Sequence, residues 1–326
     1  MVTNAVQYIV EGGHRLSGTI RPSGNKNAAL PIVAAALLSD KPVVLENVPR
    51  IRDVETLVQL VQSVGASAEW AERNTLHIHA KSLRAADLDP ELCKKIRGAI
   101  LLAAPLLARC GEVTLPPPGG DVIGRRRLDT HFLALEQLGS TYKIGKRLEF
   151  KTSGLKGVDM FLDEPSVTAT ENAITAAVAA KGTTVIGNAA CEPHVQDLCH
   201  FLVALGARID GIGTNRVTIQ GGGSLSGATH RIGPDHIEVG SFIGLAAVTK
   251  SSLRIERAGV EHLRAIRMGF ERLGVVCEVD GDDLVVPTAA TAAVMAFSVA
   301  VTLGSSRKMS APRRPEVRNS KVRPIL

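Results

Sequence analysis

The stretch Leu57–Trp70, LVQLVQSVGASAEW, is the first of four similar segments, and this repetition predicts the fold. Each copy is a run with helical period that ends in Leu or Val, followed by Gly and a short strand-like segment. The copies are centred on Gly65, Gly139, Gly206 and Gly274, at intervals of 74, 67 and 68 residues. Glycine directly after a helix adopts the left-handed conformation without steric cost, so each copy predicts a helix end.

The repeat extends upstream of these glycines. Asn47 and Asn188 each lie 18 residues before the glycine of their unit and follow a short strand-like run. Apolar helix-like segments come earlier: NAALPIVAAALL, GAILLAAPLLARC, ENAITAAVAA and SFIGLAAVT. A helix that is apolar nearly all round should be buried. Strand-like segments such as TLHIHAK, RLEFKTS and RVTIQG alternate instead, as in sheets with one face in water. The sequence therefore predicts an α/β fold with helices inside and sheets outside.

Composition and charge favour a soluble globular protein. The 326 residues suffice for two domains, with 45% hydrophobic and 21% charged residues. The formal charge of +6 belongs to residues 287–326, which carry the basic residues Arg307, Lys308, Arg313, Arg314, Arg318, Lys321 and Arg323 against Glu316. The rest of the chain is balanced, so the net charge says little about the substrate.

Several classes of protein are disfavoured. Aromatic residues make up 3% of the chain, which argues against a stacking platform for single-stranded nucleic acid. Five irregularly spaced cysteines argue against a disulfide framework, and the N-terminus lacks a signal-peptide pattern. The uncharged stretch Leu284–Ser306 is rich in Ala, Thr and Ser, so it is a poor membrane anchor. We expect a cytoplasmic protein with neither a nucleic-acid partner nor a membrane partner.

The segment Pro22–Asn27, PSGNKN, stands before the first buried helix and is a candidate anion site. A helix N-terminus attracts anions, and Lys26 adds a positive charge. An ordinary helix cap with a solvated lysine explains the same residues. The local pattern alone favours that second interpretation.

The segment Gly119–His131, GGDVIGRRRLDTH, is a second candidate. Three arginines in succession could hold a diphosphate, and Asp121 could act as an acid if closure over a substrate raised its pKa. A solvated charged loop is the alternative, and the residues leave both open.

Two further segments favour structural roles. Asp163–Asn172 precedes the third buried helix, and capping by Ser166, Thr168 or Thr170 is the favoured interpretation. Cys191, His194, Cys199 and His200 suggest a metal site, but neighbouring Cys199 and His200 would point about 100° apart on a helix. We therefore expect no metal there, with Glu192 and His194 at a helix start.

Taken together, these segments resemble the enolpyruvyl transferases, in particular the UDP-N-acetylglucosamine 1-carboxyvinyltransferases. The resemblance runs from residue 8 to about 286 and rests on SGNKNAALP, NVPRIRDVETL, GGDVIGRRRLDTH, EPSVTATEN, NAACEPHVQDL and GPDHIEVGSF. The related shikimate-phosphate enzymes share the fold but open on a different lysine motif.

The resemblance implies an inside-out α/β barrel of the EPSP synthase type, built from βαβαββ-type units of which four of the family's six are visible. Residues 21–234 would form the first domain. Residues 1–20 and 235–286 would form an incomplete second domain, in which apolar faces such as that of SFIGLAAVT stay partly uncovered. Residues 287–326 match nothing in the family, and we expect a tail translated out of frame or from a damaged gene.

The implied reaction transfers the enolpyruvyl group of phosphoenolpyruvate to the 3′-hydroxyl of UDP-N-acetylglucosamine and releases phosphate. This transferase step opens peptidoglycan synthesis, and hence serves cell wall biogenesis, cell shape and cell division. It needs no cofactor and no metal. A non-catalytic UDP-sugar-binding remnant, or an enzyme like 3-phosphoshikimate 1-carboxyvinyltransferase, is the alternative.

The resemblance also assigns site residues. Asp121 would be the catalytic acid, at a position where many members carry cysteine. Lys26 and Asn27 would bind phosphoenolpyruvate. The sugar nucleotide would be bound by Arg97, Arg126, Arg127, Leu128, Asp129, Thr130, Ser166 and Val167.

Overall fold

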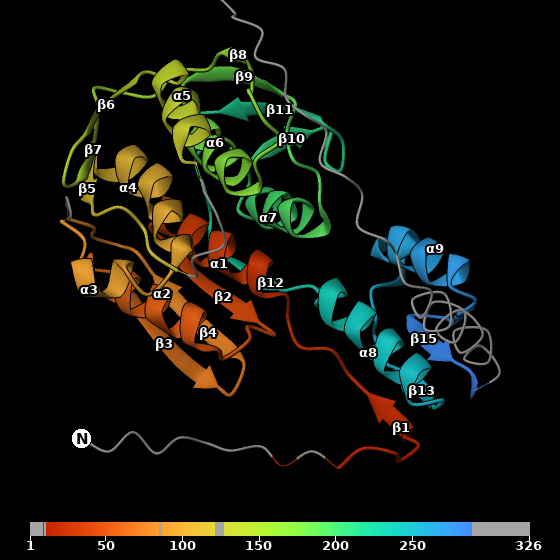
Figure 1. Ribbon diagram of the computed structural model, residues 1–326. Coiled ribbons are helices and arrows are strands. Elements are labelled where there is room, and N and C mark those ends of the chain that lie inside the picture. The colour runs from red at the N-terminus through yellow and green to blue at the C-terminus, as the bar shows by residue number, and fades with distance from the viewer. Residues whose placement is uncertain (1–8, 10, 85–86, 121–126, 289–326) are drawn as a thin grey trace, which may run out of the picture.

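The computed structural model describes residues 9, 11–84, 87–120 and 127–288, and its elements follow the repeated units (Figure 1). The first unit comprises α1 (Lys26–Ala35), η1 (Ala36–Leu38), β2 (Pro42–Glu46), α2 (Arg52–Ser63), β3 (Ser67–Glu72) and β4 (Thr75–His79). The second comprises α3 (Pro90–Cys93), η2 (Arg97–Leu102), α4 (Ala103–Cys110), β5 (Glu112–Leu115), α5 (Asp129–Gln137), β6 (Ser140–Ile144) and β7 (Leu148–Thr152).

The remaining elements repeat the same order. The third unit comprises β8 (Asp159–Phe161), α6 (Val167–Ala179), β9 (Gly182–Gly187), α7 (Pro193–Ala204), β10 (Arg208–Asp210) and β11 (Arg216–Gly221). The fourth comprises α8 (His236–Val248), β13 (Ser252–Ile255), η3 (Val260–His262), α9 (Arg264–Arg272), β14 (Glu278–Asp280) and β15 (Asp283–Val286). Strands β1 (Ser17–Ile20) and β12 (Ala228–Arg231) precede α1 and α8, as β8 precedes α6.

The repeated glycines end helices as predicted. Gly65, Gly139, Gly206 and Gly274 all have positive φ, between 81° and 107°, directly after α2, α5, α7 and α9. A side chain at these positions would strain the backbone.

The repeated asparagines also occupy equivalent positions. Asn47 and Asn188 have φ of 55° and 56°, and asparagine tolerates this left-handed region better than most residues. Each Nδ2 atom donates to a backbone oxygen 2.9 Å away, that of Ile232 for Asn47 and that of Leu162 for Asn188. Both accepting residues directly follow the strand that pairs in parallel with the strand before the asparagine. The repeat is therefore one of backbone geometry as well as of sequence.

Helices occupy the interior of the larger part of the molecule, which confirms the inside-out arrangement. Eight of the ten residues of α1 and ten of the thirteen of α6 are buried, and α6 packs against both α1 and α4. Three sheets, with strand orders β12-β2-β4-β3, β5-β7-β6 and β10-β11-β9-β8, lie around these helices (Figure 1). Their strands alternate between buried and less buried residues, as in β11.

Strands β1 and β12 each pair with a strand of the other structural part of the molecule. Strand β1 pairs in parallel with β13, whereas β12 pairs in parallel with β2 of the first unit. Two separate clusters of buried apolar residues result, one from Ala28 to Ile232 and one from Val239 to Val286. We call the bodies around them the large lobe and the small lobe. The chain crosses between them twice, after β1 and after β12.

The two crossings lie side by side and begin matching helices. The backbone N–H of Asn25 donates to the Gly233 oxygen, and that of Asp235 donates to the Ser23 oxygen, both at 2.9 Å. The side chain of Asn25 caps α1, and that of Asp235 caps α8. The Nδ2 atom of Asn25 also lies 3.1 Å from Nδ1 of His236, so one residue caps a helix and joins the lobes.

We predict that Asn25→Ala lowers the free energy of unfolding by about 1–2 kcal/mol, because the cap of α1 and the contact to His236 are both lost. Thermal unfolding should show a midpoint lower by several degrees. Asn25→Asp keeps the capping oxygen and loses only the donor to His236. Its unfolding midpoint should therefore lie between those of wild type and Asn25→Ala. Equal midpoints for wild type and Asn25→Ala would contradict this role.

The small lobe buries its central helix less completely. Only four of the thirteen residues of α8 are buried, and Leu245 and Val248 are exposed. The expected partial exposure of SFIGLAAVT is thus confirmed within residues 235–288 of the structure. Across the described ranges, no helix combines the length and the apolar character needed to cross a lipid bilayer.

Candidate active site

A cleft of about 340 Å³ opens where five helices of the large lobe begin. The starts of α1, α2, η2, α6 and α7 all contribute to its wall. Its lining residues are Lys26, Asn27, Leu30, Asp53, Lys95, Ile96, Arg97, Gly98, Leu101, Gly120, Val167, Thr168, Glu171 and His194. The cleft therefore brings together four residues that the resemblance implied, Lys26, Asn27, Arg97 and Val167.

The electrostatics of this cleft favour anions. Backbone N–H groups at the start of α1 and α6 give these helix ends a partial positive charge. Lys26, Lys95 and Arg97 add three cationic side chains, against the carboxylate of Asp53. Phosphate or carboxylate groups are the ligands that such a site recognises best.

Lys26 is oriented by an ion pair. Its Nζ atom lies 3.1 Å from Oδ2 of Asp53, and the Lys26 side chain is 42% exposed. The cap of α1 is Asn25, whose Oδ1 accepts from the N–H groups of Asn27 and Ala28. The ordinary helix cap is thus confirmed, while the half-exposed Lys26 side chain pairs with Asp53 at the wall of the cleft.

Arg97 connects the cleft to the start of α5. Its Nη2 atom donates to the backbone oxygen of Arg127 at 3.2 Å. The Arg127 guanidinium pairs with Asp129 at 2.7 Å and with Asp163 at 3.6 Å. The hydrogen bond to Asp129 raises the pKa of Arg127, and Thr130 Oγ1 donates to Asp163 at 2.6 Å.

This network holds three of the predicted sugar-nucleotide residues, Arg127, Asp129 and Thr130, close together. Leu128 is half-buried and directly precedes α5. An anion bound by Arg127 would have to compete with the two carboxylates that already contact it.

The start of α6 differs from the prediction. Val167 lines the cleft, but the Ser166 side chain makes no capping hydrogen bond, so capping by Ser166 is wrong. Thr168 and Thr170 do not cap the helix either. The Thr168 hydroxyl contacts Nε2 of His131 at 3.0 Å, and Thr170 accepts from the N–H of Ala190. Tertiary partners have replaced the local ones.

The predicted acid, Asp121, and Arg126 lie outside the described residues. The residue before Asp121, Gly120, lines the cleft with φ of 94°. At Gly119, a Cβ atom would fall 1.8 Å from the Lys94 backbone oxygen, so only glycine fits there. The glycine pair thus brings the chain against the cleft before residue 121.

Glu171 lines the cleft and was not predicted as a site residue. It is 2% exposed, and its Oε1 atom has no hydrogen-bond partner. Burial raises the pKa of its carboxyl well above the usual range, and the nearby Glu192 adds to this. A single charged residue in the buried helical run ENAITAAVAA could have indicated it.

A buried histidine supports the wall of the cleft from behind. Nδ1 of His131 accepts from Nδ2 of Asn172 at 2.9 Å, and Asn172 also donates to the Ile100 oxygen. His131 therefore donates from Nε2 to Thr168. Burial, with the nearby Arg97, lowers its pKa to about 3, so the ring is neutral. The network links α5, α6 and η2.

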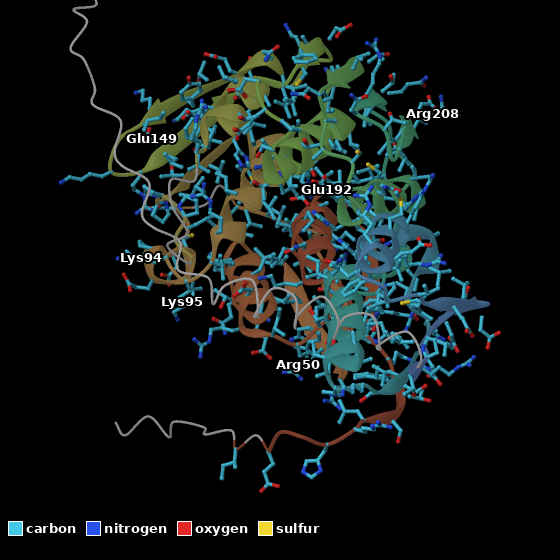
Figure 2. All side chains as sticks on the ribbon, turned by 45° about the vertical axis from the view of Figure 1, so that its right-hand side comes forward. Arg50, Lys94, Lys95, Glu149, Glu192 and Arg208 are labelled. Carbon is cyan, nitrogen blue, oxygen red and sulfur yellow. The ribbon has the colours of Figure 1, made fainter. Side chains whose placement is uncertain are left out.

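The cysteine and histidine segment forms the start of α7. Glu192, labelled in Figure 2, precedes this helix and His194 is its second residue, so both stand at a helix start as expected. His194 also lines the cleft, which was not predicted. Cys199 is buried, which raises its pKa to about 12, whereas His200 is exposed. Among the residues that the structure describes, no cluster of His, Cys, Asp and Glu is arranged to hold a metal ion.

A second hollow, of about 400 Å³, lies at the opposite ends of the central helices. Its arginine, Arg109, already donates to the backbone oxygens of Leu37 and Ala80. Carbonyl ends of helices line this hollow, so it does not match the cleft as an anion site.

Comparisons with known proteins agree with this geometry. A family model described as EPSP synthase (3-phosphoshikimate 1-carboxyvinyltransferase) matches residues 10–301, beyond the expected limit at 286. A protein of Bradyrhizobium diazoefficiens is 75% identical over 87% of this chain and 66% of its own length. A protein of Bacteroides thetaiotaomicron is 44% identical over 89% of this chain and 68% of its own length. Both are named UDP-N-acetylglucosamine 1-carboxyvinyltransferase.

Solved structures show the same fold. The enolpyruvyl transferase NikO from Streptomyces tendae matches with a TM-score of 0.74 and 26% identity, over 85% of this chain and 66% of that one. An EPSP synthase from Acinetobacter baumannii matches in fold, with a TM-score of 0.67 and 18% identity over 86% of this chain and 66% of that one. The chain thus spans about 66% of the length of the first of these relatives. It belongs to the EPSP synthase family of enolpyruvyl transferases.

Proposed function

We propose that the cleft serves the transfer of the enolpyruvyl group from phosphoenolpyruvate to the 3′-hydroxyl of UDP-N-acetylglucosamine, with release of phosphate. The observation that carries the proposal is the convergence of Lys26, Asn27, Arg97 and Val167 on one cleft with three cationic side chains. Both substrates are anionic, and the names of the relatives contain UDP-N-acetylglucosamine and the carboxyvinyl group. The reaction would be the cytoplasmic opening step of peptidoglycan synthesis, and so serve cell wall biogenesis and cell division.

The chemistry is an addition followed by an elimination. In the addition, the sugar oxygen bonds to C2 of phosphoenolpyruvate, C3 accepts a proton, and the hydroxyl loses one. In the elimination, the bond from C2 to the phosphate oxygen breaks and C3 loses a proton, which restores the double bond. Asp121, the acid that the resemblance implies, would supply the proton to C3.

The described side chains would bind and orient the substrates. Lys26, held by Asp53, would neutralise the charge of phosphoenolpyruvate beside Asn27. Arg97 would contact the sugar nucleotide, and Arg126 would meet its phosphate. The uridine would lie along Arg127, Leu128, Asp129 and Thr130, and Ser166 and Val167 would contact the diphosphate or the uracil. Preformed donors of this kind stabilise developing charge without reorganisation.

We also propose that residues 21–234 act as the first substrate-binding domain and residues 1–20 with 235–286 as part of a second one. The two separate apolar clusters support this division. The double crossing at Asn25 and Asp235 would then be the hinge about which the domains close.

A phosphate-release assay with both substrates tests the function. We expect release that depends on phosphoenolpyruvate and on UDP-N-acetylglucosamine together. Release with shikimate 3-phosphate in place of the sugar nucleotide would overturn the choice of acceptor. Binding of the sugar nucleotide without release would support a non-catalytic UDP-sugar binder, a second candidate because the described cleft residues all lie in the large lobe.

A further inference from the structure

Two buried polar groups in the cleft have no partners. Six buried side-chain N or O atoms lack a hydrogen bond in the described part of the chain, and two of them, Glu171 Oε1 and His194 Nδ1, belong to residues that line this cleft. Buried polar atoms are almost always satisfied by protein, water or ligand. Because both residues belong to the wall of the cleft, a molecule bound there is a candidate partner for these atoms.

Helix geometry directs Glu171 toward the cleft. Val167, Thr168 and Glu171 are spaced three and four residues apart on α6, so they share one face, and all three line the cleft. The following residues of the helix, such as Ala173 and Ile174, pack into the apolar core of the large lobe. Glu171 is the one ionisable residue in α6 and is 2% exposed.

The chemical form of this side chain limits what it can bind. Burial and the neighbouring Glu192 raise the pKa of Glu171 well above its usual range, which favours the neutral acid, a side chain with one donor and with acceptor oxygens. A bound anion would satisfy only the donor. A hydroxyl or an amide both donates and accepts, so it can satisfy either oxygen.

We propose that Glu171 contacts a hydroxyl or the N-acetyl amide of the sugar in the sugar nucleotide, and so determines specificity for the sugar. This inference rests on the proposed function. The cations of the cleft, Lys26, Lys95 and Arg97, bind the charged groups, whereas Glu171 recognises an uncharged one. The diphosphate alone would gain nothing from Glu171.

Calorimetric titration of the full chain with UDP and with UDP-N-acetylglucosamine tests this inference. Glu171→Met keeps the length of the side chain and removes its polar atoms. We expect it to weaken binding of UDP-N-acetylglucosamine about tenfold and to leave UDP binding within twofold, which corresponds to one lost hydrogen bond of ordinary strength. Glu171→Gln, also a neutral donor and acceptor, should stay within about threefold of wild type for both ligands.

A matched control and a spectroscopic measurement separate recognition from packing. Thr175→Val alters a buried polar residue one turn further along α6, outside the cleft, and should change neither affinity. In infrared difference spectra of the wild type, the carbonyl band of the protonated carboxyl, assigned by its absence in Glu171→Gln, should shift with UDP-N-acetylglucosamine but not with UDP. This second measurement needs no folded Glu171→Met variant.

The outcomes are distinct. Equal loss of both ligands in Glu171→Met, or a band that does not respond to the sugar, overturns the inference and leaves the proposed function intact. A wild-type chain that binds neither ligand overturns both. A loss confined to the sugar nucleotide, with rescue by Glu171→Gln, supports the assignment.

Discussion

Replacement of Lys26 by methionine should lower the rate of phosphate release at least a hundredfold and weaken binding of phosphoenolpyruvate at least tenfold. The Nζ atom lies at the start of α1, where it is held 3.1 Å from Asp53 and lines the cleft. Charge-assisted hydrogen bonds contribute about 1.5–3 kcal/mol, and loss of one preorganised donor typically costs a factor of about 10²–10³ in rate. Phosphate release and calorimetric titration measure the two effects.

Lys41→Met is the matched control for this substitution. Lys41 belongs to the same repeat unit, its side chain is 60% exposed, and it pairs with Asp40 at 3.6 Å, away from the cleft. It should affect neither rate nor affinity, because exposed ion pairs contribute little. A Lys26→Met enzyme with normal turnover, or equal losses in both variants, would show that Lys26 does not bind the substrate.

The parts of the fold that follow from local backbone geometry could be predicted from the sequence. Gly65 and Gly206 follow helix ends, where the backbone has a positive φ. Asn47 and Asn188 recur at the same spacing because the same left-handed backbone conformation recurs at both positions. These requirements act at single positions. They are therefore visible in a single chain without knowledge of its tertiary contacts.

Strand pairing could not be predicted from the same patterns. Strand β1 directly precedes α1 in the chain, yet it pairs with β13, and the parallel partner of the first unit is β12. Nothing in the residues of β1 or β12 specifies this exchange, because pairing depends on which edges the assembled units leave available. The resemblance, not the periodicity, indicated that residues 1–20 belong with those after 235.

Some residues of the candidate site could be predicted from local motifs, and others could not. Lys26, Asn27, Arg97 and Val167 stand in recognisable motifs, and the structure brings them to one cleft. Asp53 lies 27 residues from Lys26 in the chain, and no local pattern connects the pair.

Helix starts were harder to interpret than motifs. The hydroxyls expected before the third buried helix favoured capping, but Thr168 and Thr170 lie inside α6 and contact His131 and Ala190 instead. Those partners are distant in sequence. Glu171 was not predicted as a site residue, although a lone ionisable residue in a buried helix indicates a functional position.

The stability of the large lobe should depend on pH through His131. Burial holds the pKa of this histidine at about 3 in the folded protein, against 6.5 for a free side chain. Below pH 6.5 His131 is therefore protonated in the unfolded chain, whereas in the folded chain it is protonated only below about pH 3. The free energy of unfolding should fall across this window, by roughly 4–5 kcal/mol in total at about 1.36 kcal/mol per pKa unit.

Denaturant unfolding of wild type and His131→Asn between pH 7 and pH 4 isolates this contribution. Asparagine can still accept from Asn172 but does not titrate, so the variant should be less stable at pH 7 and lose less stability on acidification. The comparison is needed because Glu171 acts in the opposite direction: its raised pKa favours the folded state at low pH. Parallel curves for wild type and His131→Asn would show that the ring is not held neutral by burial.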